Sequence, residues 1–207
     1  MKRGFFITLE GGEGAGKSTQ ARRLRDFLQT AGRDAVLTRE PGGTPAAEAI
    51  RALLLDPQTR LAPMAETLLH FAARADHVAG VITPALERGA DVVCDRFFDS
   101  TMAYQGYGMG VPRAAIAGLI RLTKLIPDLT LVLDLPDFEA KLRLVRRGAP
   151  VDRYERMDAA MARRIREGFR EIAAREPARC VLIDAAAPEE CVFHAVLEAV
   201  RARLSLP

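Results

Sequence analysis

Residues 11–18 read Gly-Gly-Glu-Gly-Ala-Gly-Lys-Ser, a spacing that matches the glycine loop with which many proteins bind phosphate groups. A short apolar run precedes this loop at 5–9, and a pattern with apolar residues three and four apart follows it from 18. In this order, a strand, a loop and a helix let backbone N–H groups surround phosphate oxygens at the positive end of the helix. These residues therefore predict an α/β fold with a phosphate site after its first strand.

Two side chains of the loop carry chemistry of their own. Lys17 is placed to neutralise the β- and γ-phosphates of a nucleotide, and Ser18 is placed to ligate magnesium. We expect the loop and the start of the following helix to bind the nucleotide together, through Gly11, Gly12, Glu13, Gly14, Ala15, Gly16, Lys17, Ser18 and Thr19.

The composition limits the class of protein. A length of 207 residues suffices for one domain with a full core, and a net charge of +3 weakly favours anionic ligands without indicating nucleic-acid binding. No apolar run approaches the roughly 20 residues of a membrane span, and no signal peptide precedes the glycine loop. Cys94, Cys180 and Cys191 lack the spacing of metal ligands. We therefore expect a cytoplasmic protein whose partners are neither membranes nor nucleic acids.

Apolar runs alternate with helical patterns along the whole chain. We expect strands at 5–9, 35–38, 91–94, 130–134 and 180–184, and helices at 18–31, 45–55, 64–88, 112–124, 137–146, 156–176 and 188–204. Such alternation predicts a central parallel sheet of five strands with helices on both faces, and ligands beyond the carboxyl ends of the strands. We expect a single domain over 1–207, with a mobile basic loop at about 146–155.

Polar residues follow the second and third expected strands directly. Asp95 is placed to reach magnesium at the glycine loop and Arg96 to reach a phosphate, although a structural ion pair is the alternative interpretation. Arg39 precedes the tight turn around Pro41, where it faces either the same crevice or solvent.

Further candidates lie on the helix at 64–88 and just after Arg96. Phe71 and Arg74 share one helix face, so they can stack on a base and hydrogen-bond its edge, or else form a core ring with an arginine that extends to solvent. Residues 99–106 resemble a polar loop that offers hydroxyls, an amide and a ring near the crevice.

The basic loop contains candidates for catalysis. Phosphoryl transfer develops negative charge on the moving group, and an arginine placed over that group contributes several orders of magnitude in rate. Arg146, Arg147 and Arg153 are the candidates.

Together these segments resemble the thymidylate kinase family, whose members transfer phosphate from ATP to dTMP. The resemblance spans nearly the full chain and rests on the glycine loop and on the matching segments at 38–44, 71–74, 95–97, 100–106, 127–130 and 152–155. It implies the P-loop NTPase fold of nucleoside monophosphate kinases, ATP with Mg²⁺, and a homodimer. A glycine loop with Glu13 and no arginine, beside a basic lid, resembles the bacterial form, in which the lid supplies the catalytic arginine.

The resemblance also implies individual roles. Arg39, helped by Arg96, would bind the dTMP phosphate, and Arg74 would hydrogen-bond thymine. Tyr104 would exclude a ribose 2′-hydroxyl, and Glu13 would approach the 3′-hydroxyl. The catalytic residues would be Lys17, Arg96, Arg147 and Arg153, and the metal ligands Ser18 and Asp95. The dTMP pocket would comprise Glu13, Arg39, Pro41, Phe71, Arg74, Arg96, Ser100, Thr101, Tyr104 and Gln105.

The chain departs from the family pattern at two positions. Many relatives place the thymine-stacking phenylalanine four residues before the arginine, where this chain has His70; either Phe71 or His70 stacks, and we favour Phe71. Phe97 stands where other members carry Tyr or His, so a polar contact there is in doubt. Two other functions are compatible with the motifs: a kinase for another nucleotide such as dUMP or CMP, and a switch protein that hydrolyses ATP to change partners.

Overall fold

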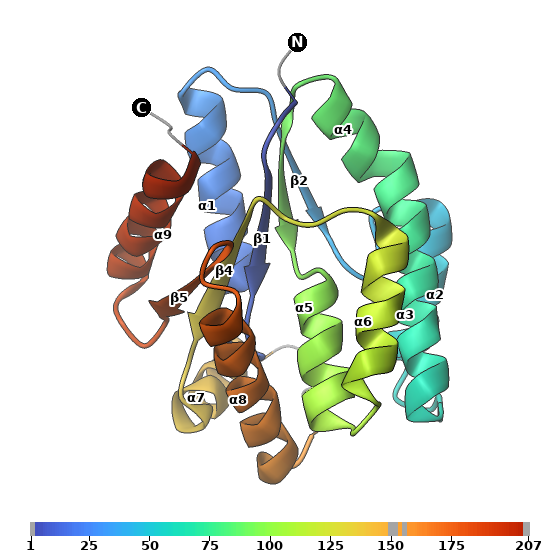
Figure 1. Cartoon of the computed structure of the whole chain (residues 1–207). Coiled ribbons are helices and arrows are strands. Elements are labelled where there is room, and N and C mark those ends of the chain that lie inside the picture. The colour runs from blue at the N-terminus through green and yellow to red at the C-terminus, as the bar shows by residue number, and fades with distance from the viewer. Residues whose placement is uncertain (1–2, 149–152, 155–156, 205–207) are drawn as a thin grey trace.

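A five-stranded parallel sheet forms the centre of the computed structural model, which describes residues 3–148, 153–154 and 157–204 (Figure 1). The strand order is β2-β3-β1-β4-β5. The strands are β1 (Phe6–Glu10), β2 (Ala35–Arg39), β3 (Asp91–Asp95), β4 (Leu129–Asp134) and β5 (Cys180–Asp184). Each begins and ends within one residue of its predicted range, and the predicted sheet is confirmed.

Helices connect the strands along the chain. They are α1 (Lys17–Thr30), α2 (Pro45–Leu55), α3 (Pro63–His77), η1 (Val78–Ile82), α4 (Thr83–Glu87), α5 (Phe98–Thr101), η2 (Met102–Gly108), α6 (Arg113–Thr123), α7 (Asp137–Arg147), α8 (Ala159–Arg175) and α9 (Glu189–Leu204). The helix predicted at 64–88 continues through α3, η1 and α4, with η1 a π-helical turn in its middle. Among the described residues, no helix is long and apolar enough to cross a membrane.

The polar loop expected at 99–106 is instead helical. This segment forms α5 and the π-helical η2, which pack against α8 and α6. Ala103, Tyr104 and Gln105 are all buried there, so the segment has no exposed face. Without an exposed face it lacks the alternation of apolar and polar residues by which a surface helix is recognised.

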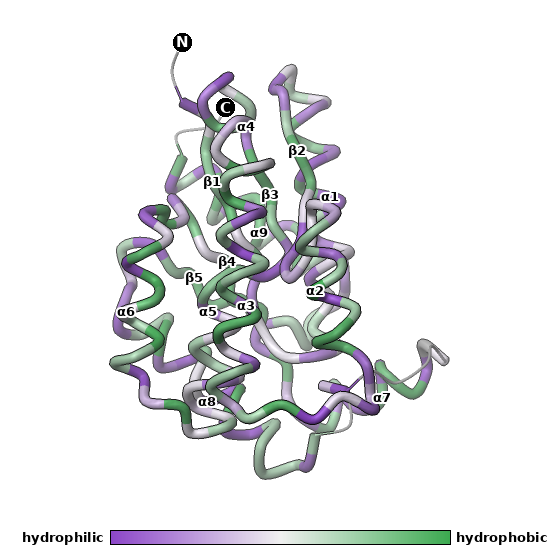
Figure 2. Tube along the Cα trace, turned by 90° about the vertical axis from the view of Figure 1, so that its right-hand side faces the viewer, coloured by the Kyte–Doolittle hydropathy of each residue, from purple (hydrophilic) through white to green (hydrophobic). Residues whose placement is uncertain are grey.

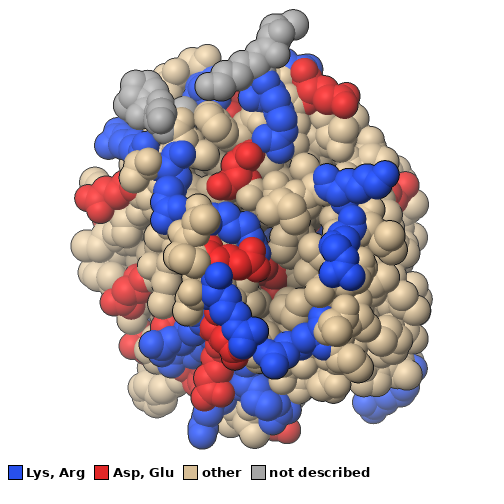
Figure 3. All heavy atoms as spheres, in the orientation of Figure 1, with Lys and Arg blue, Asp and Glu red and all other residues tan. Residues whose placement is uncertain are grey.

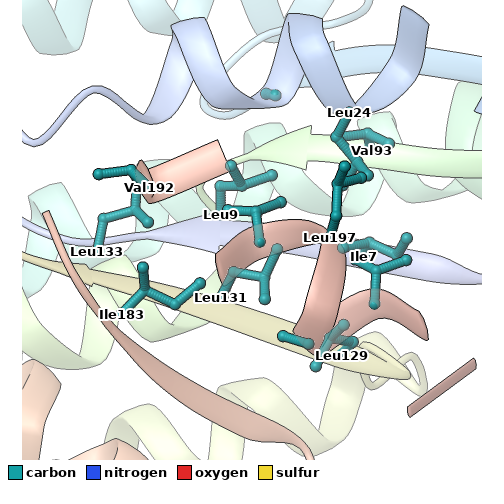
Figure 4. Close-up of a cluster of buried hydrophobic side chains, with 14 of the residues drawn as sticks. Ile7, Leu9, Leu24, Val93, Leu129, Leu131, Leu133, Ile183, Val192 and Leu197 are labelled. Atoms are coloured by element: carbon teal, nitrogen blue, oxygen red, sulfur yellow. The ribbon is translucent and has the colours of Figure 1, made fainter. Parts of the chain in front are cut away.

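Side chains alternate between the two faces of the sheet. Ile7 and Leu9 of β1, together with Leu131 of β4, pack against α1 and α9, as Figure 4 shows. Phe6 of β1 faces the opposite way, where it packs with Ile82 of η1. Strands covered on both faces are mostly apolar, and in Figure 2 the tube along the central strands is accordingly coloured mostly as hydrophobic.

The strand register aligns the ends that carry the candidate residues. Asp95 of β3 pairs with Leu9 of β1 on one side and with Arg39 of β2 on the other. The segments after these three strands therefore meet at one edge of the sheet, opposite the edge where both chain termini lie (Figure 1). At that edge Gly11 has φ 132°, and a Cβ atom built on it would lie 2.4 Å from the Leu133 carbonyl oxygen, so the chain turns there only as glycine.

Candidate active site

The glycine loop leads from β1 into α1. Gly16 has the left-handed φ of 90°, and α1 begins with the next residue, Lys17. The Lys17 ammonium is buried and donates to the Gly12 carbonyl oxygen at 2.7 Å. Burial, reinforced by the nearby Arg96 charge, lowers its pKa to about 8. A phosphate anion would restore a favourable environment for this charge.

Ser18 and Asp95 place two oxygen ligands side by side. The Ser18 hydroxyl donates to the Asp95 carboxylate, although the two residues lie 77 positions apart in the chain. A hydroxyl and a carboxylate are oxygen donors of the kind that Mg²⁺ prefers, with remaining positions left to phosphates and water. The pair therefore fits the magnesium site predicted from the sequence. Among the described residues, no group of three or more His, Cys, Asp or Glu side chains could hold a metal ion.

Arg96 links the glycine loop to the helices that follow β3. Its backbone adopts φ 69°, in the left-handed region. The guanidinium donates to the Gly11 carbonyl at 2.9 Å, to Ser100 Oγ at 3.0 Å, to Glu13 Oε1 at 2.6 Å and to Tyr104 Oη at 3.1 Å. The two interpretations that the sequence left open are thus combined, because Arg96 is ion-paired and also lines the cavity described below.

Glu10 holds the segment that follows Arg96 in place. Its fully buried carboxylate accepts hydrogen bonds from Phe97 N at 2.7 Å and from Ser100 Oγ at 2.5 Å. Burial raises its pKa to about 8, and the neighbouring Asp99 charge adds to the shift. Sequence reasoning missed Glu10, whose one signal was a carboxylate at the end of an otherwise apolar strand.

Arg39 and Arg51 approach the cavity from the second strand and from α2. Arg39 is half-exposed and its NH2 atom lies 3.0 Å from each carboxylate oxygen of Glu48. Arg51 donates to the Pro41 carbonyl at 2.8 Å, which holds it against the turn. Sequence reasoning did not select Arg51, because nothing near it in the sequence shows that α2 turns this side chain toward the turn at Pro41.

Arg74 is buried, and one nitrogen of its guanidinium has no hydrogen-bond partner among the described residues. Its Nε atom donates to Glu40 Oε2 at 2.7 Å, and NH2 donates to Thr101 Oγ1 at 3.1 Å. The NH1 atom has no hydrogen-bond partner among the described residues, although it is buried. An unpaired buried donor costs free energy until a ligand satisfies it. Arg74 lines the cavity, so the carbonyl of a bound base is a suitable acceptor.

The structure places His70, and not Phe71, on the cavity. Phe71 is buried in an apolar cluster with Val111 and Ile116 and does not belong to the lining. The preference for Phe71 as the ring that stacks on a base is therefore corrected in favour of His70. The reason is how α3 is rotated: the two side chains point about 100° apart, and α3 turns His70 to the cavity and Phe71 into the cluster with Val111 and Ile116.

One cavity of about 470 Å³ connects these groups. The predicted residues that line it are Glu13, Gly14, Gly16, Lys17, Ser18, Thr19, Arg39, Pro41, Arg74, Asp95, Arg96, Ser100, Thr101, Tyr104 and Gln105. His70, Arg51, Arg143 and Tyr154 also line it, and these four were not among the predicted site residues. Gly11 and Gly12 line a second cavity of about 100 Å³ beside α7 and α8, and Ala15 is buried in the core.

The predicted lid lies partly outside the described residues. Residues 149–152 and 155–156 fall outside them, and so does the side chain of Arg147. Arg153 is described and forms an ion pair with Glu66, so the structure does not bring it to Lys17. Arg143, one helical turn before Arg147, reaches the cavity instead and donates to the Ala185 carbonyl at 2.8 Å.

Charges of both signs lie side by side on the face of the molecule that Figure 3 shows, where Lys and Arg side chains stand next to Asp and Glu side chains.

The fold and the cavity define a class of protein. A glycine loop after the first strand of a parallel sheet, facing a group of arginines across one cavity, is the arrangement of a P-loop phosphotransferase of the nucleoside monophosphate kinase type. The model of the thymidylate kinase family matches residues 9–196. The chain belongs to the thymidylate kinase family.

Individual relatives agree with this membership. The chain is 52% identical to a thymidylate kinase of Gluconobacter oxydans, with 99% of this chain and 97% of that protein covered. It is also 52% identical to one of Caulobacter vibrioides, over the full length of both. The crystal structure of the thymidylate kinase from Ehrlichia chaffeensis superimposes with a TM-score of 0.76 at 35% identity, covering 96% of this chain and 99% of that one.

Proposed function

We propose that this chain transfers the γ-phosphoryl group of ATP to dTMP, which gives dTDP and ADP. The observation that carries the proposal is one cavity that is lined both by Lys17 and Ser18 and by Arg74 and Gln105. We take the first pair as the ATP end and the second as the acceptor end, so that two phosphorylated ligands would meet between Lys17 and Arg39. Holding two anions in that geometry supplies much of the catalysis in phosphoryl transfer.

At the ATP end, the chain supplies backbone and charge. The N–H groups at the start of α1 point toward the loop, and Lys17 would exchange its contact with the Gly12 carbonyl for the β- and γ-phosphates. Ser18 and Asp95 would hold Mg²⁺, which when bound neutralises phosphate charge. No strong base is needed, because the phosphate of dTMP is itself the nucleophile.

At the acceptor end, separate groups would hold the phosphate and the base. Arg39 is half-exposed at the mouth of the turn, so it can turn from Glu48 to the dTMP phosphate, with Arg96 nearby. The unused NH1 donor of Arg74 suits the O4 carbonyl of thymine. His70 would stack on the ring, and Gln105, Ser100 and Thr101 would complete the pocket.

Charge on the moving phosphoryl group requires a further cation. We assign this role to Arg147, at the carboxyl end of α7, together with the lid that follows it. Arg153 forms an ion pair with Glu66. We therefore expect that replacing Arg153 would affect dTMP binding more than the stabilisation of the moving phosphoryl group.

One assay separates this function from its alternatives. ADP release is measured with a panel of nucleoside monophosphates, namely dTMP, dUMP, dCMP and CMP, and with ATP alone. We expect turnover that depends on dTMP and is greatest with it. Turnover of ATP without an acceptor would instead support a switch protein, and a maximum with CMP would support a different kinase.

We also propose that the chain acts as a homodimer in the cytoplasm. The family resemblance implies the dimer, and α2 and α3 expose Leu53, Met64 and Leu68 although the two helices pack together. Sedimentation equilibrium tests the assembly, and a monomer at micromolar concentration would contradict it. The use of ATP as a substrate supports the proposed cytoplasmic location.

A further inference from the structure

Glu66 is a fully buried carboxylate on α3 that lies behind the wall of the cavity. Gln105 Nε2 donates to its Oε1 atom at 2.9 Å, and the Tyr154 hydroxyl donates to the same atom at 2.9 Å. Arg153 forms an ion pair with its Oε2 atom. Gln105 belongs to η2, whereas Arg153 and Tyr154 belong to the described part of the lid. Glu66 therefore contacts two segments that are distant from it and from each other in sequence.

This carboxylate determines how the Gln105 amide is oriented. Glu66 forms an ion pair with the guanidinium of Arg153, and a carboxylate in an ion pair accepts hydrogen bonds and donates none. The Gln105 atom that faces Glu66 must therefore be the amide nitrogen. Its oxygen is then left for the cavity, which Gln105 lines, and no hydrogen bond among the described residues reaches that oxygen.

The same carboxylate also orients His70. Tyr154 has one hydroxyl hydrogen and gives it to Glu66, so it must accept from His70, whose Nε2 lies 2.9 Å away. His70 therefore carries its proton on Nε2, with its ring fixed against the cavity. One buried group thus sets the hydrogen-bonding direction of two side chains that line the acceptor end.

A fixed acceptor in the cavity distinguishes between pyrimidines. Thymine and uracil carry a hydrogen on ring nitrogen N3 and can donate to an amide oxygen. Cytosine has a lone pair at N3, which would face the oxygen and leave both atoms without a donor. Leaving buried polar atoms unpaired is an effective means of rejecting a ligand.

We propose that Glu66 is the positioning residue that sets the base specificity of the site, by turning the Gln105 oxygen toward the cavity so that it accepts the N3 hydrogen of a uracil-type base. This inference rests on the proposed function and deepens it. Glu66 touches neither substrate, so its effect is on selectivity for the base and not on the ATP end.

The test compares kcat/KM for dUMP and dCMP, which differ only at N3 and C4. In Glu66→Gln, the new amide oxygen should face Arg153, because a guanidinium can only donate hydrogen bonds. The new NH2 group then faces Gln105. Gln105 must then invert and present its own NH2 group to the cavity. We expect the dUMP preference to fall about tenfold or more, while the KM for ATP stays within twofold of wild type. Arg74 still favours O4, so part of the preference remains.

Two matched variants control the result. The exchange Glu66→Gln with Gln105→Glu keeps the same groups and returns an acceptor to the cavity, so it should recover most of the preference. Glu66→Asp keeps the carboxylate and should lose affinity while retaining selectivity. A preference unchanged within twofold in Glu66→Gln, or lost equally in Glu66→Asp, would overturn the proposal.

Wild-type protein supplies an independent measurement in case the variants do not fold. Titration calorimetry without ATP should show N3-methyl-dUMP binding about tenfold or more weakly than dUMP, and equal affinities would overturn the proposal. This measurement also separates the two levels of inference. Absent phosphoryl transfer with intact discrimination at N3 would reject the proposed function alone, whereas normal transfer without that discrimination would reject the role of Glu66 alone.

Discussion

Arg96 donates to Glu13 Oε1 across 2.6 Å and thereby joins the segment after β3 to the glycine loop after β1. The Tyr104 hydroxyl donates to the same Glu13 oxygen at 2.8 Å. The loop expected to bind ATP and the ring expected to contact the sugar of dTMP therefore share one carboxylate. Glu10 holds the far side of this group through Ser100, so the ATP and acceptor ends of the cavity are positioned by one hydrogen-bonded network.

Lys17→Ala should abolish transfer and leave the fold intact. Burial lowers the pKa of Lys17, so its ammonium is poorly solvated in the free protein and its loss should not reduce stability. Removing a charge aimed at the phosphates should lower kcat/KM at least about a hundredfold. The exposed Lys124 provides a control, because Lys124→Ala should leave activity unchanged. Near-normal turnover in Lys17→Ala would remove the assignment of the ATP site.

Arg39→Ala should weaken dTMP binding far more than ATP binding. A contact between a guanidinium and a phosphate is charge-assisted and often bidentate, so the KM for dTMP should rise about ten- to a hundredfold. The only described ion-pair partner of Arg39 is the half-exposed Glu48, so stability should change little. Arg25→Ala is the matched surface control. A rise in the KM for ATP at constant KM for dTMP would mean that the two sites are reversed.

His70→Phe should change how stability depends on pH. Burial, followed by the Arg74 and Arg96 charges, lowers the pKa of His70 from 6.5 to about 3. Between these values the unfolded chain binds a proton that the folded protein does not, so falling pH favours unfolding by at most about 1.4 kcal/mol per pH unit.

The phenylalanine variant lacks this linkage. Its free energy of unfolding relative to wild type should therefore increase as the pH falls from 6.5 to 5, as measured by urea denaturation. His194→Phe, at an exposed position on α9, should show no such trend. Parallel pH curves for wild type and His70→Phe would show that His70 binds its proton as readily in the folded protein as in the unfolded chain.

Arg179→Met should destabilise the fold. Arg179 forms two hydrogen bonds with Asp99, at 2.7 and 2.8 Å, and a third with Thr130 at 2.8 Å. Both charged groups are buried. Removing one partner of a buried ion pair costs about 3–5 kcal/mol, because the other charge remains unpaired.

A double variant identifies the cause of that loss. Asp99→Asn combined with Arg179→Met removes the unpaired charge and should recover part of the stability in a urea titration. Arg175→Ala, in an exposed pair with Glu171, should cost less than about 1 kcal/mol. Equal losses in the single and double variants would mean that packing of the arginine, and not its charge, supports the fold.

The sheet was predictable from sequence because strands buried on both faces are nearly continuous apolar runs. The runs at β1 and β4 marked strands without any knowledge of their neighbours. The segment at η2 was not predictable, because its residues are buried all round and its helix has no polar face. Its helical state depends on packing against α8, which no local pattern reveals.

The candidate site was likewise predictable only in part. Lys17, Arg39 and Arg74 lie in local motifs and were predicted, and each lines the cavity. Glu66 was missed because its partners are remote: Tyr154 lies 88 residues away in sequence, and Gln105 lies 39 residues away. His70 was considered but set below Phe71, since the direction of each side chain depends on how α3 rotates against its neighbours.

Tyr104 should enforce the choice of deoxyribose. Its ring lines the cavity and packs edge-on against Tyr154, while its hydroxyl is engaged by Glu13 and Arg96. A ribose 2′-hydroxyl against this ring would lose water without gaining a partner. That loss costs about 1–3 kcal/mol, which corresponds to roughly ten- to a hundredfold in discrimination.

The ring and the hydroxyl of Tyr104 can be tested separately. Tyr104→Ala should narrow the preference for dTMP over ribothymidine monophosphate, measured as the ratio of kcat/KM values. Tyr104→Phe keeps the ring and should keep the preference, but it deprives Glu13 and Arg96 of a shared partner and should lower kcat/KM for both substrates. If the ratio in Tyr104→Ala stays within twofold of wild type, the ring serves packing alone. Sugar selection would then fall to Glu13, the other candidate at the sugar, and Glu13→Gln would be the variant that alters it.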